Sequence, residues 1–307
     1  MLIATKDTVY SLNGDPTEPR AVLNGGDVQA IAIGRSIGLA ALHHGKVAVL
    51  SQNGRRTLDT GIEEPIECLL ILDEEPVRFL VGVEAPHVYA VADDDTERLG
   101  AFDALECRED WYTPWGGPAA VRSMARTRDG WVYADIHVGS IMRSPDRGRS
   151  WEPVTPDLHQ DVHQVATSPG EDDRVYANTA HAVYLSEDRG KSWQHRSDGF
   201  PYFYGRAIAV HPEEPDCLLA SVSTGPHGNA QGQLYRTDNA GRVWSHVTSG
   251  FPETTAGNID TFHIGFTPDG RAWSVAENTL YGSQDRGLTW ASAWQAPSNI
   301  CMIAVQQ

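Results

Sequence analysis

The phrase SPDRGRSW, at residues 144–151, is repeated almost unchanged further along the chain. Copies occur as SEDRGKSW at 186–193 and SQDRGLTW at 283–290, and a weaker copy, TDNAGRVW, occupies 237–244. The tryptophans that end the four copies, Trp151, Trp193, Trp244 and Trp290, are separated by 42, 51 and 46 residues. Periods of this size are typical of the four-stranded blades of a β-propeller.

The text between the copies predicts β-strands. In WVYADIHVGSIMRS (131–144), RVYANTAHAVYLS (174–186) and RAWSVAENTLYGS (271–283), aromatic and β-branched residues alternate with small or polar ones. Gly, Asn and Asp occur between the predicted strands, as expected of turns. No long segment has the 3.6-residue periodicity of a helix. The fold class that follows is all-β.

The blade count rests on short strands that open each repeat. They lie at 28–33, 66–71, 121–126, 162–167, 205–210 and 262–266, and a last one lies within 299–305. We expect one domain, 1–307, forming a seven-bladed propeller of four-stranded antiparallel blades. The blades are 1–26 plus 299–305, 27–64, 65–110, 119–155, 160–197, 204–248 and 259–295. A C-terminal strand that completes the first blade would leave no open edge. Six blades are the alternative, if the N-terminal repeats merge.

The repeated phrase resembles the Asp-box, or BNR, repeat of sialidases, sortilin-type receptors, xyloglucanases and the photosystem II assembly propeller. The resemblance implies that the box is a turn between the two outer strands of a blade. Asp146, Asp188 and Asp285, with the box serines, would bond to the turn backbone. The tryptophans would pack between strands. In the fourth copy Asn239 and Val243 replace the aspartate and the Ser/Thr. The boxes are therefore interpreted as structural.

Charge and composition narrow the classes of partner. The 307 residues include 24 basic and 41 acidic ones, for a formal charge of −17. Such an acidic protein repels phosphate backbones and anionic lipid, so neither nucleic acid nor a membrane is an expected partner. The N-terminal MLIATKDTVYSLNG has no signal-peptide pattern, and the four cysteines are scattered. A cytoplasmic location is the expectation.

Polar residues gather at one end of the predicted blades. The inner strands place Gln29, Glu67, Arg122, His163, Arg206, Phe262 and Cys301 at equivalent positions. Six of the 12 histidines, including His137 and His227, fall in turns between second and third strands. The connections DWYTPWGG (110–117) and DGFPYFYG (198–205) add aromatic rings. A water-filled channel, ordinary surface histidines and rings that anchor loops are the simpler explanations, and they remain open.

Five short phrases carry a second resemblance. HVG (137–139), DVH (161–163), YGRA (204–207), STGPHG (223–228) and GNIDT (257–261) are similar to phrases in compact, signal-less bacterial and archaeal BNR proteins. Those proteins are often labelled sialidase-like or glycosyl hydrolase-like. The likeness spans about residues 120–305. It implies a shared pocket formed by His137, Asp161, His163, Tyr204, Arg206, His227, Asn258 and Asp260.

The resulting hypothesis is a protein that binds a small polar or anionic ligand at the channel mouth, with or without transforming it. His137 and His163 would move protons, oriented by Asp161 and Asp260. The ligand-binding residues would be Glu67, Arg122, Tyr204, Arg206, His227 and Asn258.

Two other functions remain open. One is a metal-dependent hydrolase or lyase with a divalent ion between His137 and His163, completed by Asp161 or Asp260. The other is a non-catalytic scaffold that binds a protein partner. Classical sialidase activity is not expected, because the equivalent positions of the inner strands supply Arg122 and Arg206 but no third arginine.

Overall fold

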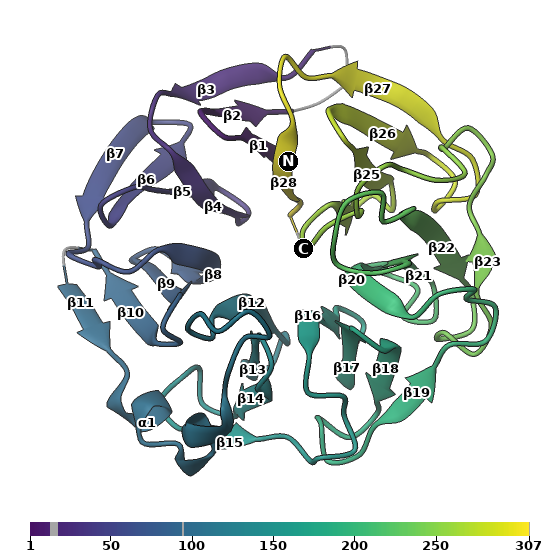
Figure 1. The fold of residues 1–307 in the computed structure, drawn as a ribbon. Coiled ribbons are helices and arrows are strands. Elements are labelled where there is room, and N and C mark those ends of the chain that lie inside the picture. The colour runs from purple at the N-terminus through teal and green to yellow at the C-terminus, as the bar shows by residue number, and fades with distance from the viewer. Residues whose placement is uncertain (13–17, 94, 307) are drawn as a thin grey trace.

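The computed structural model describes residues 1–12, 18–93 and 95–306. The described chain forms seven four-stranded antiparallel sheets arranged in a ring around a central axis (Figure 1). The predicted seven-bladed all-β propeller is confirmed, and the six-bladed alternative is wrong. In the described part of the chain, no helix combines the length and the apolar character that crossing a membrane requires.

The blades are numbered 1 to 7 along the chain. Blade 1 contains β28 (Ile300–Ala304), β1 (Leu2–Thr5), β2 (Thr8–Ser11) and β3 (Arg20–Asn24); blade 2 contains β4 (Val28–Ile33), β5 (Ile37–Leu42), β6 (Lys46–Ser51) and β7 (Gly54–Asp59). Blade 3 contains β8 (Ile66–Glu74), β9 (Val77–Val83), β10 (Val88–Ala92) and β11 (Asp95–Arg98). The short helix α1 (Gly100–Asp103) and the 3-10 helix η1 (Glu106–Asp110) connect blade 3 to blade 4.

Blade 4 contains β12 (Val121–Arg126), β13 (Val132–Ile136), β14 (Ser140–Ser144) and β15 (Glu152–Pro153). Blade 5 contains β16 (Val162–Ser168), β17 (Glu171–Thr179), β18 (Ala182–Ser186) and β19 (Gln194–Arg196). Blade 6 contains β20 (Tyr204–Val210), β21 (Leu218–Ser223), β22 (Gln233–Thr237) and β23 (Ser245–His246). Blade 7 contains β24 (Ile264–Phe266), β25 (Ala272–Ala276), β26 (Thr279–Ser283) and β27 (Ala291–Gln295).

The two ends of the chain close the ring in blade 1. Strand β28 pairs antiparallel with β1, with Ile303 opposite Ile3 and Ala304 opposite Leu2. As a result the innermost strand of blade 1 comes from the C-terminus and its other three strands come from the N-terminus (Figure 1). Closure of this kind removes the unpaired strand edges that an open sheet would expose.

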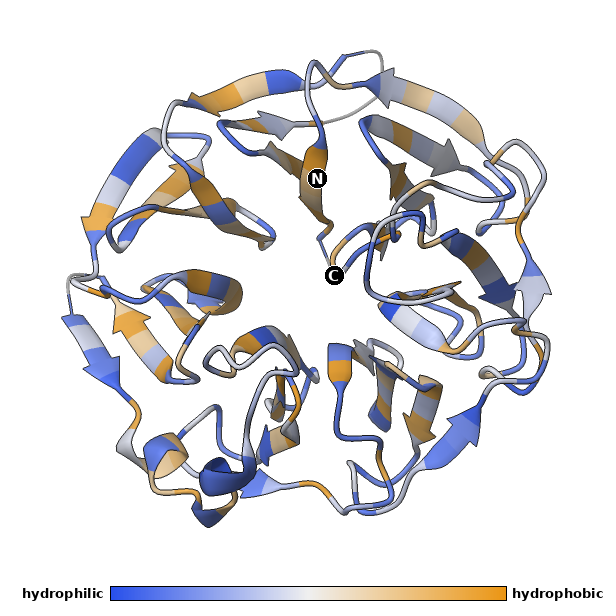
Figure 2. Cartoon of the chain, viewed as in Figure 1, coloured by the Kyte–Doolittle hydropathy of each residue, from blue (hydrophilic) through white to orange (hydrophobic). Residues whose placement is uncertain are grey.

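The hydrophobic core lies between neighbouring blades. Alternate residues of the inner and middle strands, such as Leu39, Phe79, Tyr133 and Tyr176, are fully buried. The outermost strands β11 and β19 are mostly polar (Figure 2). Successive residues of a strand point to opposite faces of the blade, and near the axis each face packs against a neighbouring blade. Both faces are therefore buried there, while the outermost strands remain in solvent.

The repeated box is a turn between the third and fourth strands. In blade 4 the amide of Ser150 donates to Asp146 Oδ1 at 2.8 Å, and the Ser150 hydroxyl donates to Asp146 Oδ2 at 2.7 Å. The amide of Gly148 donates to Ser144 Oγ at 2.7 Å. The Trp151 indole donates to the Gly148 carbonyl at 2.9 Å. Box 283–290 repeats all of these contacts, and box 186–193 repeats those of its serine and aspartate. These side chains replace the backbone partners that a tight turn lacks.

The arginine of each strong box also links neighbouring blades. Three ion pairs connect the box to the preceding blade: Arg147 with Asp73, Arg189 with Asp129, and Arg286 with Glu214. Ala240 takes this position in the weaker fourth copy and cannot form the pair. The boxes follow the third strands, so they lie at the end of the ring opposite the beginning of the innermost strands. Their arginines reinforce the contact between blades.

Candidate functional site

In six blades the innermost strand carries a β-bulge near the beginning of the strand. The residues left out of the pairing register are Gln29, Glu67, Arg122, His163, Arg206 together with Ala207, and Cys301. A bulge re-aims a side chain relative to the regular pleat. Phe262 stands just before β24 in blade 7 and has a φ of 63°. The same β-bulge therefore occurs at corresponding positions of six inner strands around the channel.

Side chains of the second strand support these bulges. The Asp135 carboxylate accepts from the Ser123 amide, and Ser221 Oγ accepts from the Ala207 amide at 2.9 Å. Asn178 donates to the carbonyl of Ala207 at 2.7 Å. A bulge frees backbone groups from the ladder, and buried groups of this kind need another partner. No pattern in the sequence indicates this supporting role of the three second-strand residues.

Three electron-donating atoms meet where blades 4 and 5 adjoin. Asp161, just before β16, places Oδ1 at 3.1 Å from His163 Nε2 and at 3.4 Å from His137 Nε2. His137 follows β13, and its ring centroid lies 4.8 Å from that of Trp115. His163 is fully buried and His137 nearly so, with 5% of its surface exposed. The phrases HVG and DVH therefore come together in space.

The orientation of the His163 ring is set by a backbone carbonyl. Its Nδ1 lies 2.5 Å from the carbonyl oxygen of Gly205. Because a carbonyl only accepts hydrogen bonds, Nδ1 carries the proton. The other nitrogen, Nε2, faces Asp161 and lies 3.5 Å from the Tyr204 hydroxyl. In this tautomer a neutral His163 presents a lone pair to the cluster.

Burial and nearby arginines keep both imidazoles neutral. Burial and, to a smaller extent, the charge of Arg122 lower the pKa of His137 to about 4, against the opposing effect of Asp161. Burial also lowers the pKa of His163. Burial raises the pKa of Asp161, but the polar and positive groups around it, among them Arg122, outweigh this and lower it. At neutral pH the cluster is an ionised carboxylate beside two neutral imidazoles.

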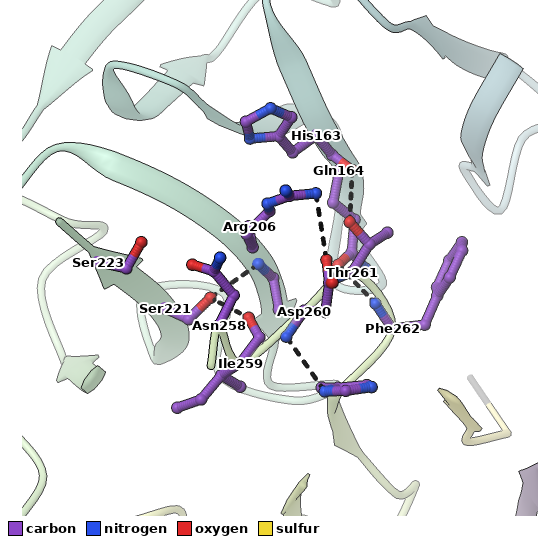
Figure 3. A network of polar contacts seen from close by, with 12 residues as sticks. His163, Gln164, Arg206, Ser221, Ser223, Asn258, Ile259, Asp260, Thr261 and Phe262 are labelled. Atoms are coloured by element: carbon purple, nitrogen blue, oxygen red, sulfur yellow. Dashed lines mark hydrogen bonds and ion pairs between the residues drawn. The ribbon is translucent and has the colours of Figure 1, made fainter. Parts of the chain in front are cut away.

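Arg206 and Asp260 form the next part of the site, in blade 6 and the connection to blade 7 (Figure 3). Arg206 Nη1 lies 3.3 Å from Asp260 Oδ1, and its Cζ lies 5.2 Å from the centroid of the Tyr204 ring. Burial raises the pKa of Asp260, but the charges of Arg206 and His263 outweigh it and lower the pKa. The tyrosine, the arginine and the carboxylate therefore line the same side of the channel mouth as His163.

The segment that follows Asp260 crosses the channel. Thr261 Oγ1 donates to the carbonyl of His163 at 3.0 Å, and the Phe262 amide donates to Gln164 Oε1 at 3.2 Å (Figure 3). Phe262 then packs against the core cluster that contains Cys68 and Met124, in blades 3 and 4. Sequence reasoning missed Gln164 and Thr261.

A cavity of about 470 Å³ occupies the other part of the channel. Its lining includes Gln164 and Phe262 and continues along the apolar inner strands towards Arg126 and Asp73, at the opposite end. Phe262, at the end of the crossing segment, lies on the wall of this cavity, whereas His137, Asp161 and His163 are not among its lining residues. The site and this cavity are distinct features of the channel.

The remaining residues of the hypothesis lie around this cluster. Arg122 is half-buried at its bulge and influences the ionisation of Glu67, Asp135 and His137. Burial raises the pKa of Glu67, an effect that Arg122 opposes.

Asn258 and His227 belong to loops of blade 6 and its connection to blade 7. Asn258 Nδ2 donates to the Gly225 carbonyl at 3.3 Å. His227 is exposed in the loop between β21 and β22. The described contacts therefore join His137, Asp161, His163, Tyr204, Arg206 and Asp260, and they leave His227 outside.

The ring of four-stranded blades and the repeated box turn define a BNR-like Asp-box propeller, and the comparisons with known proteins support this class. The family model described as Sortilin-Vps10 (sortilin, neurotensin receptor 3) matches residues 139–258. A xyloglucanase from Paenibacillus sp is 25% identical over 212 residues, which cover 54% of this chain and 20% of that protein. The chain thus spans about a fifth of the length of this curated relative.

Two solved structures share the architecture. An ancestral GH74 enzyme superposes with a TM-score of 0.65 at 16% identity, covering 95% of this chain and 40% of the other. YCF48 bound to D1 peptide superposes with a TM-score of 0.57 at 14% identity, covering 95% and 84%. At these identities the likeness concerns the fold alone, because one fold carries many functions.

Proposed function

We propose that the protein binds a small anionic ligand at the channel mouth, held by Arg122 and Arg206 on either side of His163. The observation that carries the proposal is the repeated bulge, which presents these three side chains from three successive blades. An inner strand of regular pleat would alternate its side chains between faces. The bulges interrupt this alternation at corresponding positions of three successive inner strands, which supports a shared site.

The two arginines have hydrogen-bond donors to spare. Among the described residues Arg122 forms no ion pair within 4.0 Å, and Arg206 forms one, with Asp260. The Nε of Arg206 is buried without a hydrogen-bond partner in the described part of the chain. An unpaired buried donor costs about 1–3 kcal/mol. A carboxylate, sulfate or phosphate oxygen accepts from a guanidinium in the bidentate geometry that would remove this cost.

Aromatic rings and the relatives favour a sugar-based anion. Trp115 keeps 68% of its surface exposed beside His137, and the Tyr204 ring lies beside Arg206. Flat rings of this kind stack on sugar faces. The name of the xyloglucanase relative points to a sugar by analogy, and the two arginines add the requirement for an anion. Sugar acids and sugar phosphates are therefore the first ligands to test.

The test is a thermal-shift screen with uronic acids, sugar phosphates and the corresponding neutral sugars. We expect anionic members to raise the melting temperature of the protein. Arg122→Met/Arg206→Met should abolish the shift, and Arg126→Met should retain it. Arg126 is the matched control because it lies on the same strand as Arg122, at the opposite end of the channel. Equal shifts for the neutral sugars, or for the double variant, would contradict the proposal.

A second candidate function, a protein-binding scaffold, is favoured by one observation. Tyr112, Trp115 and Phe203, on connections of the same face, keep 53%, 68% and 44% of their surface exposed. Exposed aromatic residues are enriched in protein interfaces. In this case Trp115→Ser/Phe203→Ser should abolish partner binding measured with a purified partner, and Arg122→Met/Arg206→Met should leave it intact. The reverse pattern would favour the small ligand.

A further inference from the structure

We propose that His137, Asp161 and His163 bind one first-row divalent transition metal ion of the Zn²⁺ type, and that this ion completes the anion site. The inference rests on the proposed function for the identity of the site. It adds a metal centre and a chemical reason for the position of the two histidines.

The spacing of the donor atoms fits a metal ion. The three candidate ligand atoms lie within 4.8 Å of one another. Two of the separations, 3.1 Å and 3.4 Å, join Asp161 Oδ1 to the two Nε2 atoms. Donors at the corners of a tetrahedron, bonded to zinc at about 2.0–2.1 Å, are separated by about 3.3 Å. Small side-chain rotations suffice to close the set around one ion.

The hydrogen bonds around the cluster orient it for a cation. His163 Nδ1 donates to the Gly205 carbonyl, so Nε2 presents its lone pair towards Asp161. A histidine held in this way through its other nitrogen is the usual arrangement of a metal ligand. Asp161 Oδ1 is buried, and no described residue makes a well-directed hydrogen bond to it. Buried lone pairs that converge on one point repel each other unless a cation lies between them.

The donor set also selects the class of metal. Two imidazoles and one carboxylate suit zinc, iron, cobalt or nickel, whereas calcium and magnesium prefer oxygen ligands throughout. Three protein ligands leave at least one coordination position open, as in catalytic zinc sites. The positive charges of Arg122 and Arg206 disfavour a metal cation nearby. Two carboxylates offset these charges, because Asp260 pairs with Arg206 at 3.3 Å and Glu67 lies near Arg122. An anionic ligand that bridges the ion and an arginine would balance the charge.

The experiment uses the full chain purified without an affinity tag and stripped of metal by a chelator. Calorimetry with ZnCl₂ alone should show one tight site per chain. His137→Ala and Asp161→Asn should each weaken Zn²⁺ binding by more than about a hundredfold, because losing even an outer partner of a metal ligand costs 10–100-fold. Co²⁺ should give the intense visible spectrum of a tetrahedral site in the wild-type protein, which tests the geometry without any variant.

His181→Ala is the matched control. His181 occupies the turn of blade 5 that corresponds to the turn of His137 in blade 4, but it is exposed and stacks on the surface histidine His195. It should bind Zn²⁺ as the wild type does. Absence of binding, a spectrum of six-coordinate Co²⁺, or an equal loss in His181→Ala would overturn the proposal.

The metal site and the anion site fail in distinguishable ways. If the stripped protein binds no Zn²⁺ but binds sugar acids with full affinity, and this binding depends on Arg122, the metal inference is wrong and the proposed function stands. If Zn²⁺ binds at His137 and Asp161 but no anion binds in its presence, the metal site stands and the proposed function is wrong.

Discussion

Nδ1 of His163, in blade 5, donates a hydrogen bond of 2.5 Å to the carbonyl oxygen of Gly205, in blade 6. The carbonyl of His163 in turn accepts from Thr261 Oγ1, on the connection to blade 7. One buried residue therefore ties three blades together at the channel mouth. Its imidazole is held rigidly while one nitrogen remains available, which is the arrangement that a ligand or metal site needs.

The first prediction concerns the close approach of Gly205 to Asn178. A Cβ added at Gly205 would lie 1.8 Å from Asn178 Oδ1. Gly205→Ala must therefore displace the asparagine that supports the bulge of Arg206, and we expect a loss of about 1–3 kcal/mol in the free energy of unfolding. Urea denaturation measures it. Gly225→Ala is the control, because nothing lies within 4 Å of its added Cβ. Similar losses in both variants would contradict this account of the bulge.

The second prediction concerns stability in acid. Slight burial raises the pKa of Asp285, but its hydrogen bonds to Thr289 and Ser283 outweigh this and lower it from 3.8 to about 2. A carboxyl group whose pKa is lower in the folded state stabilises the protein at pH values above its pKa in the unfolded state. This contribution is lost as the pH falls from about 4 to about 2. Asp285→Asn should therefore lower the melting temperature at pH 6 and flatten its fall between pH 4 and pH 2.

Thermal melts across this pH range measure the effect. Asn239, in the fourth box, shows that an asparagine accepts the same backbone hydrogen bond, from Val243 at 3.0 Å. The substitution therefore removes the charge and keeps the turn. An unchanged pH slope would show that the box carboxylate does not couple folding to protonation.

The third prediction concerns the ion pair between blades. Arg147 lies 2.7 Å from Asp73 in the preceding blade, and both side chains are partly exposed, at 39% and 31%. Because solvent screens such pairs, Arg147→Met should cost no more than about 1 kcal/mol, and raising the salt concentration should shrink the difference from the wild type. A double-mutant cycle with Asp73→Asn measures the coupling. A loss well above this, independent of salt, would mean that the arginine stem contributes mainly through packing.

The sequence predicts the fold because the constraints on a blade are local. Asp146 and Trp151 satisfy their own turn, and the apolar and small residues of β13 and β14 pack between blades on both faces. The same local rules hold in each repeat, so the count of repeats gives the count of blades. Blades 1, 2 and 3 lack the box, and only the pattern of their strands identified them.

The site was only partly predictable. The resemblance to compact BNR proteins implied that His137 and Asp161 share a pocket, and their side chains lie 3.4 Å apart. His227 looks equivalent in the sequence, but its turn extends from 224 to 232 and leaves it exposed. Thr261 lies 98 residues after His163 in the sequence and contacts it because its loop crosses the channel. No local pattern encodes that crossing, because it depends on the shape of the closed ring.

The most direct test of the central claim is to locate the bound anion. A crystal structure of the protein with a sugar acid identified by the thermal-shift screen would show which side chains contact the bound anion. We predict its carboxylate between Arg122 and Arg206, beside His163. A ligand bound only in the cavity of about 470 Å³, near Arg126, would contradict the account.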